Sequence, residues 1–502
     1  MNRIRLISVM SLLLCSLAGV SAQTYDRMLR SNFWNASYNV TGIRQDSVSR
    51  SYAELSGNYE DGGFRDTWQA PRGWSAGVST ASIQHLEKMS LKGSFAFTQT
   101  EGYDMCGSMF IKPGYYPVDI LEFTPGRKTL QTYAFNGGIS YDVAEGWRIG
   151  AMMDFESANM AKRKDLRHTN WKLDMRLAPG IMYHSGDFAL GASYIYNRNS
   201  ETVNAEQVGT AESSYYAFFD KGLMYGVYQV WTGSGVHLDE AGVNGLPVKE
   251  NTNGTAVQVE YKGLFAEIEY AHSLGTVGEK EYIWFRFPGN LVDVNLAYKA
   301  SSVKGEHFAF LDFGWKSQIT HETVLEKITE NGVTTVIGHG SNLMQQREEI
   351  KIRPSYEYVA EDWEISASAQ MVLKNGMASQ MYPYVYTQSL FTTSVMVGGL
   401  VRFGAVELTA GVAYGGGNVV EESRLAGENE GILTSPFRLQ NWYDLQVEYD
   451  TADKVGVDLA LKYSFKNGLY VKAAGCWLHG FGLKYAPGAD RCSATLGLGY
   501  EF

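Results

Sequence analysis

The sequence RCSATLGLGYEF, from Arg491 to Phe502, is the stretch that decides the fold. Its even-numbered positions, from Cys492 to Phe502, are all apolar, and its odd-numbered positions are small or polar. Because the side chains of a β-strand alternate between two faces, this stretch predicts a strand with one apolar and one polar face. We expect the apolar face to meet either a second sheet or lipid.

The N-terminus has the features of a secretory signal peptide, which we place at residues 1–22. Arg3 and Arg5 supply positive charge, residues 6–20 are mostly apolar, and Val20 to Ala22 offers a cleavage site. No run of about 18 or more apolar residues follows, so we expect no membrane-spanning helix. Export without a helical anchor leaves the periplasm, the medium or the outer membrane of a Gram-negative cell.

The composition favours a membrane barrel over a soluble enzyme. The chain has 32 Tyr, 23 Phe, 11 Trp and 54 Gly, but only 11 Pro. Barrels use aromatic residues for two interfacial girdles and glycine for tight turns and curved strands. The net charge of −11 argues against nucleic acid as a partner.

Segments of alternating apolar and polar residues recur along the chain. They include residues 147–155, 171–177, 363–371 and 455–465, in which Leu459 faces one side and Asp458 the other. We therefore predict an all-β fold, a single transmembrane antiparallel β-barrel at residues 49–502 with an even number of strands, about 16 to 22. Residues 23–48 are expected in the periplasm or tucked into the lumen.

The turns are of two kinds, which predicts the topology. Short turns with aromatic flanks lie at 141–147, 358–363, 403–405 and 465–470, and long polar loops include 321–344 and 415–431. Barrels place short turns in the periplasm and long loops outside. An even number of strands must run between two periplasmic turns. If Tyr443 to Tyr449 is a strand, the strands between the turns at 403–405 and 465–470 are one short of an even number. We therefore expect one more strand at Ile432 to Gln440, with a periplasmic bend near Asn441.

The chain resembles outer-membrane β-barrels of Bacteroidota-type bacteria, which include large families known only as a domain of unknown function. The signal peptide, the Val-Ala-Glu-x-Trp turns at 143–147 and 359–363, and the ending Leu498 to Phe502 carry this resemblance. It implies an outer-membrane location and insertion by the barrel assembly machinery, with Tyr500 and Phe502 as the assembly signal. It assigns no residue to an activity.

No catalytic, cofactor-binding or metal-binding residues are identified, and we do not expect an enzyme. The nine His residues show none of the spacings typical of metal sites. His272 and Ser273 point to opposite faces of their strand, so they cannot form a catalytic pair. The basic stretch from Lys162 to His168 is a candidate contact for lipopolysaccharide phosphates, in addition to outer-membrane lipid.

Charged residues on the polar face of the expected strands are candidates for lining the lumen. They are Arg148, Asp154, Glu156, Lys172, Asp174, Arg176, Glu267, Glu269, Glu448, Asp458 and Lys462. Such mixed charge can line a water-filled pore, or it can pair across a narrow barrel and plug it.

Two functions remain open at this point. The first is a porin-like channel or transport protein for small solutes, without an energised plug of its own. The alternative is a barrel that serves as a docking or accessory component for a secreted, surface or TonB-dependent partner.

Overall fold

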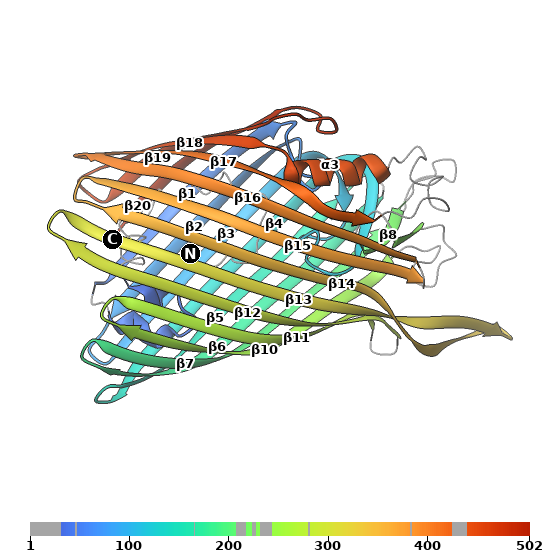
Figure 1. The fold of residues 1–502 in the computed structure, drawn as a ribbon, viewed down its shortest axis with the longest axis horizontal. Helices are drawn as coiled ribbons and strands as arrows, with labels where there is room; N and C mark the ends of the chain where they lie inside the picture. The colour runs from blue at the N-terminus through green and yellow to red at the C-terminus, as the bar shows by residue number, and fades with distance from the viewer. Residues whose placement is uncertain are drawn as a thin grey trace.

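One closed β-barrel makes up most of the molecule (Figure 1). The computed structural model describes residues 32–45, 48–164, 166–206, 217–222, 227–230, 243–279, 282–381, 384–423 and 439–502. Two short strands, β8 (Ala217–Gly222) and β9 (Val227–Val230), form a hairpin that pairs with β4. The other 18 strands close into an antiparallel barrel, which confirms the predicted fold and an even strand number. The predicted signal peptide lies outside the described residues.

The barrel strands follow one another around the wall in chain order. They are β1 (Arg50–Gly62), β2 (Arg72–His85), β3 (Met89–Ser108), β4 (Asp119–Ala144), β5 (Trp147–Lys162), β6 (Arg167–Ser185), β7 (Phe188–Glu206), β10 (Val243–Tyr261), β11 (Leu264–Glu279), β12 (Tyr282–Ser302), β13 (Gly305–Glu330), β14 (Val333–Val359), β15 (Trp363–Met381), β16 (Tyr384–Phe403), β17 (Val406–Ser423), β18 (Lys454–Ser464), β19 (Leu469–Gly480) and β20 (Asp490–Glu501).

The last strand, β20, closes the barrel against the first. Tyr52 of β1 lies opposite Glu501 of β20, and the pairing continues to Gly62 and Arg491. The alternation seen in the sequence determines the two faces: Leu496 is 68% exposed on the outside, whereas Gly497 is buried on the inside. Apolar side chains on the outer face and polar ones on the inner face are typical of a barrel in lipid.

The two rims of the barrel differ. One rim, called here the short-turn rim, carries tight turns such as those at 145–146, 262–263 and 404–405, and also the C-terminus (Figure 1). The opposite rim, called here the long-loop rim, carries longer connections, including 63–71, 109–118 and 481–489. The four short turns expected from the sequence all lie on the short-turn rim.

The expected long loop at 321–344 is wrong. β13 and β14 continue as paired strands to Glu330 and Val333 and are joined by a tight turn at Asn331 and Gly332. Both turn residues have positive φ, 50° and 78°, which Asn and Gly tolerate and which a two-residue hairpin requires. The Asn-Gly pair between stretches rich in Val, Ile and Thr is the signal that predicts this hairpin.

The expected strand at Tyr443 to Tyr449 is also wrong, and most of the expected strand at Ile432 to Gln440 lies outside the described residues. Leu439–Thr451 is a helix, α3, and β17 pairs directly with β18, so no strand lies between them in the sheet. α3 lies at the long-loop rim, on the connection from β17 to β18 (Figure 1). Asn441 lies within α3, so the expected bend there is wrong, and both ends of the barrel match the expected turns without an extra strand. Residues 432–438 lie outside the described part.

Inside the barrel, the described N-terminal segment forms two short 3-10 helices, η2 (Phe33–Ala36) and η3 (Val40–Gln45). Asn32 begins the first, because its side chain accepts a hydrogen bond from the backbone N of Trp34 at 3.1 Å. Asn39 begins the second in the same way, through Thr41. No helix in the described part of the chain is long and apolar enough to cross a membrane.

Candidate functional site: the barrel lumen

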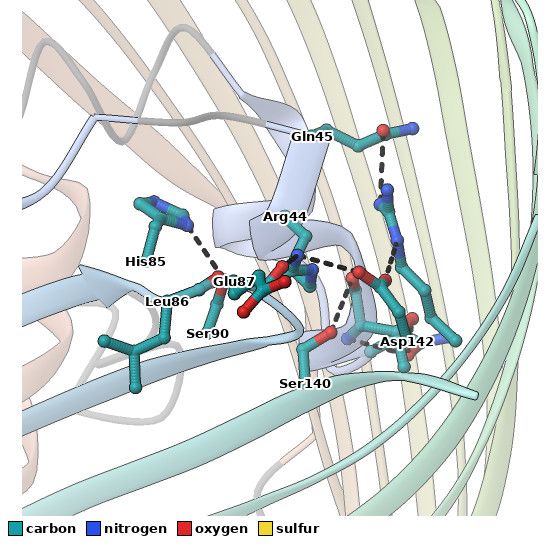
Figure 2. A network of polar contacts seen from close by, with 11 residues as sticks. Arg44, Gln45, His85, Leu86, Glu87, Ser90, Ser140 and Asp142 are labelled. Carbon is teal, nitrogen blue, oxygen red and sulfur yellow. Dashed lines mark hydrogen bonds and ion pairs between the residues drawn. The ribbon is translucent and has the colours of Figure 1, made fainter. Parts of the chain in front are cut away.

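The N-terminal segment, residues 32–45, is fixed to the short-turn rim by Arg44 (Figure 2). The Arg44 guanidinium forms an ion pair with Asp142 at 2.7 Å and donates to the backbone oxygens of Leu86 and Glu87 at 3.1 and 3.0 Å. Asp142 also accepts from Arg148 at 3.0 Å. One arginine of the segment thus holds the turn between β2 and β3 and the end of β4 together.

The segment also forms polar contacts with several further strands. Trp34 Nε1 donates to Glu260 at 2.6 Å, and Ser37 Oγ donates to Glu267. Asn39 Nδ2 lies 3.0 Å from the backbone oxygen of Ile181 and 3.1 Å from Gln258 Oε1. These partners belong to β6, β10 and β11, so the segment covers a broad arc of the inner wall.

Glycines on the inner wall make room for this segment. A Cβ atom added at Gly180 would lie 2.4 Å from Asn39 Oδ1, and one at Gly150 would lie 2.8 Å from Val40 Cγ1. At Gly138 the added Cβ would lie 2.6 Å from Val40 Cγ2. Only glycine allows so close an approach, so the wall is shaped for this segment.

At the long-loop rim, the connection between β3 and β4 (109–118) folds into the lumen. Arg347 of β14 donates to three of its backbone oxygens, those of Gly114 at 2.9 Å, Tyr115 at 3.1 Å and Tyr116 at 3.0 Å. The connection also contributes to an apolar cluster with wall residues, which include Val203, Val248, Phe285 and Phe287. This half of the lumen is therefore packed like a protein core.

α3 lies at the same rim, on the connection between β17 and β18. Its buried Tyr449 packs with Phe64, Ala413 and Leu478 in a second apolar cluster. Glu448, which the sequence placed on a strand lining the lumen, lies on α3 instead. Its carboxylate accepts from the backbone N of Tyr485 at 3.0 Å and of Ala486 at 2.8 Å.

Part of the inner wall remains open to water. Asp312 of β13 and Arg353 of β14 point into the barrel and pair at 2.7 Å, yet their side chains are 32% and 52% exposed. Inward-facing Ser94 of β3 is also exposed. An inward side chain can be exposed only where the lumen holds solvent, so an aqueous space lies beside the covered arc.

Most of the predicted lumen residues on the strands point inward and are engaged by neighbours. Arg148 pairs with Asp142, Lys172 pairs with Glu156 at 2.7 Å, and Lys462 pairs with Glu501 at 2.7 Å. The remaining strand residues of the predicted set are also buried or half-buried: Asp154, Asp174, Arg176, Glu267, Glu269 and Asp458. The structure thus places them in a packed wall, with little of their charge exposed to the open space.

The sequence prediction missed Asp312, Arg347 and Arg353. The sequence did contain a signal for an inward-facing charged row. Glu349, Lys351 and Arg353 alternate with Ile350 and Ile352, as expected of a strand with one charged and one apolar face. The role of Arg44 had no such signal, because residues 40–45 show no strand periodicity.

Tyr500 and Phe502 lie on the outer face next to the short-turn rim, with ring centroids 4.8 Å apart. His272 is exposed on the outer face and contacts Asn290 at 3.0 Å, whereas Ser273 is buried on the inner face. Within the described residues, no three His, Cys, Asp or Glu side chains are grouped so that they could hold a metal ion.

Several solved barrels are similar to this chain in fold, at low identity. The FrpB iron transporter of Neisseria meningitidis is 10% identical over 90% of this chain and 81% of that chain, with a TM-score of 0.44. OccK3 of Pseudomonas aeruginosa is 11% identical over 91% of this chain and 97% of that chain, with a TM-score of 0.35. OccAB3 of Acinetobacter baumannii is 9% identical over 91% of this chain and 100% of that chain, with a TM-score of 0.34.

These likenesses are too distant to transfer a residue role. No curated protein sequence matches the chain. One family does match over most of its length: the pattern of the Family of unknown function (DUF6850) covers residues 40–502, which includes η3 and the whole barrel. The chain therefore belongs to this family of unknown function.

Proposed function

We propose that this chain is an outer-membrane barrel that passes small polar solutes, and that residues 32–45 gate its lumen. The observation that carries this proposal is a hydrated gap in the lumen. Phe33 of the N-terminal segment packs on Phe310 of β13, and Arg347 of β14 holds residues 114–116, while the inward-facing Asp312–Arg353 pair between these contacts stays 32% and 52% exposed. A route for solutes requires such a hydrated wall. A gate requires an element that can move away from the wall.

The outer surface supports the membrane location. Leu459, Ile149 and Trp363 are 54%, 45% and 43% exposed on the outer face, where water would not favour them. In this proposal the short-turn rim is periplasmic and the barrel assembly machinery inserts the chain. At the long-loop rim, Arg163 and Lys164 are exposed, which supports contact with lipopolysaccharide phosphates.

A reversible tether tests the gate. Val40 Cβ lies 3.6 Å from the position of a Cβ atom at Gly138, which is within the range of a disulfide. The variant Val40→Cys/Gly138→Cys is made in a background in which the native Cys106, Cys476 and Cys492 are replaced by Ser. We expect low conductance in planar bilayers when the pair is oxidised and at least wild-type conductance after reduction.

Two comparisons sharpen this test. Arg44→Ala removes the rim anchor and should raise the fraction of time that the channel is open, whereas Lys88→Ala, at an exposed lysine of the neighbouring turn, should leave it unchanged. If the oxidised and reduced forms of the cysteine pair conduct equally well, the segment is not a gate. If no form conducts, the channel proposal itself fails.

One observation favours a second candidate, the docking of a secreted, surface or TonB-dependent partner. The hairpin of β13 and β14 projects beyond the rest of the long-loop rim (Figure 1). β12 pairs with β13 only as far as Glu322, and β15 pairs with β14 only from Gln345. Among the described strands, residues 323–341 thus pair only with each other, and their two outer edges are available for added strands.

Replacement of residues 324–340 by Asn-Gly tests this candidate. The shortened hairpin keeps every pairing with β12 and β15, so the barrel should assemble normally. Crosslinking in whole cells followed by purification should then lose any partner that the full-length chain captures. Equal capture by both forms would exclude the hairpin as a docking element.

A further inference from the structure

Three basic side chains lie close together on the outer face of the wall and are called here the outer basic patch. They are Arg198 of β7, Lys249 of β10 and Arg286 of β12, and all three are exposed. The strands β7, β10, β11 and β12 lie side by side (Figure 1). Lys249 lies opposite Thr276 of β11, and Thr276 lies opposite Arg286, so one row across the wall holds both charges. Arg198 lies next to this row, two residues from Ser200, which is opposite Lys249.

Among the described residues, the outer basic patch has no acid beside it on the outer face. Its direct neighbours across the strands are Met175, Ser200, Asn251, Thr276 and His321. Glu201 and Glu250 are close to the patch in sequence, but both are buried on the inner face. Within this described part of the chain, the three basic side chains form no ion pair or hydrogen bond. The wall around them is described well past the patch, since β7 continues to Glu206 and β10 begins at Val243.

The patch lies just beyond the apolar band of the wall. On β10, the exposed outer-face residues Tyr261, Val259 and Val257 belong to that band, and Tyr261 lies at the short-turn rim. Lys249 is twelve residues from Tyr261. At about 3.4 Å per residue and a strand tilt of about 40°, this separation is roughly 30 Å along the membrane normal. The apolar band of such a barrel is about 25 Å tall, so Lys249 lies outside its edge.

Tyrosines mark this edge of the apolar band. Tyr194 donates its hydroxyl to Asn253 Oδ1 at 2.6 Å, and Tyr196 donates to Asn251 Oδ1 at 3.2 Å. Tyr270 of β11 is also exposed on the outer face. Aromatic residues with a polar group are typical of the interface between lipid chains and head groups. The outer basic patch, which continues past these tyrosines, therefore lies at the depth of lipid phosphates.

Other exposed arginines toward the long-loop rim differ, because carboxylates of the protein neutralise them. Arg127 of β4 pairs with Glu101, and Arg72 of β2 lies 3.8 Å from Asp104. The charges of the outer basic patch are left for an anion from outside the chain. Arginine binds phosphate through two parallel hydrogen bonds and lysine adds a point charge, so the three groups together suit a phosphate.

We propose that the outer basic patch binds a phosphate group of a lipopolysaccharide molecule in the outer leaflet, with the acyl chains of that lipid against the apolar band. This site on the wall is separate from the turn that carries Arg163 and Lys164. The inference rests on the orientation in the proposed function, with the long-loop rim outside, and it adds the residues that hold the lipid. Lipid binding does not depend on conduction, so the two can be tested separately.

Native mass spectrometry of the full-length barrel measures the binding. The protein is released from detergent micelles that contain diphosphoryl lipid A, lipid A without its phosphates, or phosphatidylglycerol, at equal mole fractions. Diphosphoryl lipid A should remain bound, and the other two lipids should be retained much less. Arg198→Gln/Lys249→Gln/Arg286→Gln should lower the bound fraction of diphosphoryl lipid A roughly tenfold, because it removes all three charges. Arg198→Lys/Arg286→Lys keeps the charges and should retain most of the binding.

The matched control is Lys88→Gln/Lys304→Gln/Lys466→Gln, which removes three charges from exposed turns at the short-turn rim. It should bind diphosphoryl lipid A as the wild-type protein does. Heat-modifiable migration shows whether each variant is folded, and if the triple variant of the patch is not, Lys249→Gln alone should lower the bound fraction roughly twofold or more.

Three results would overturn the proposal: no retention of diphosphoryl lipid A, equal retention after the charges of the patch are removed, or equal retention of phosphatidylglycerol. The last would make the patch a general surface for anionic lipids. If lipid A is retained through the patch but bilayers show no conductance, the lipid site stands and the channel function fails.

Discussion

Gly137 and Gly138 are neighbours in β4 but face opposite sides of the barrel wall. A Cβ atom at Gly138 would lie 2.6 Å from Val40 Cγ2, whereas one at Gly137 would meet nothing within 4 Å. We expect Gly138→Ala to lower the free energy of unfolding by about 1–3 kcal/mol, the cost of overpacking, and to speed hydrogen exchange in residues 32–45. Gly137→Ala should change neither quantity, and Val40→Ala should rescue Gly138→Ala. Unchanged exchange in Gly138→Ala would mean that the segment does not depend on this contact.

Asp66, in the connection 63–71 at the long-loop rim, predicts a dependence on pH. Burial raises the pKa of its carboxyl group to about 6, although the backbone N of Trp68 and Gln69 each donate to it at 2.8 Å. Because the folded pKa exceeds the ordinary value of 3.8, ionisation costs stability as the pH rises through this window.

Asp66→Asn keeps the acceptor oxygen and removes the charge. At pH 7.5 the variant should be more stable than the wild-type protein by about 1–3 kcal/mol, and at pH 4 the two should be equally stable. Urea unfolding of barrels refolded in lipid vesicles, at both pH values, measures the difference. A constant difference between the two pH values would show that Asp66 does not titrate in this range.

At the scale of elements, the last strand is where sequence reasoning succeeded. Alternation from Arg491 to Phe502 gave both faces of β20 correctly, because twelve residues suffice to establish a period of two. The stretch from Tyr443 to Tyr449 is too short for that. Its buried residues, Tyr443, Leu445 and Tyr449, are all odd-numbered, as on one face of a strand, but Leu445 and Tyr449 are also four residues apart, as on one face of a helix. In the helix that forms, Tyr449 packs against Phe64.

The interior elements were harder to predict. Alternation states which residues of β5 and β6 face inward, but it does not state what they meet there. Residues 32–45 and 109–118 enter the lumen through long-range contacts such as Arg44–Asp142 and Arg347–Tyr115, which join positions distant in sequence. Local patterns carry no information about such pairs. The predicted residues therefore include Arg148 and Lys172 in the packed wall, and omit the exposed pair Asp312–Arg353.

The closing strand also gives a prediction about assembly. Phe502 donates its backbone N to the oxygen of Ser51 at 2.9 Å, and its side chain is 73% exposed on the outer face. Phe502→Ala keeps the backbone bond and removes the aromatic ring, so folding of the finished barrel should change little. Outer-membrane levels should fall several-fold if the assembly machinery reads that ring. Phe465→Ala, which removes another exposed aromatic residue at the same rim, should leave the level of heat-modifiable barrel normal.

At the scale of the whole molecule, the barrel has an even number of antiparallel strands. Once the rim of one turn is known, the rim of every other turn therefore follows. The 18 barrel strands place all turns such as 465–468 on the rim of the C-terminus, and all connections such as 481–489 on the other. Barrels that are inserted from the periplasm keep their short turns there, because long polar loops are the part that must cross during assembly and then remain outside. One pair of residues therefore tests the orientation of the complete barrel.

Lys484 and Lys466 are the appropriate pair, since both are exposed and they lie on either side of β19. Each is replaced by Cys in a background in which Cys106, Cys476 and Cys492 are Ser. A membrane-impermeant maleimide added to whole cells should label Lys484→Cys strongly and Lys466→Cys only after the outer membrane is permeabilised. The opposite result would show that the barrel has the inverse orientation in the membrane. α3 would then face the periplasm, and the N-terminal segment would lie at the outer rim. Labelling of both sites in intact cells would mean that the barrel does not separate the two compartments at all.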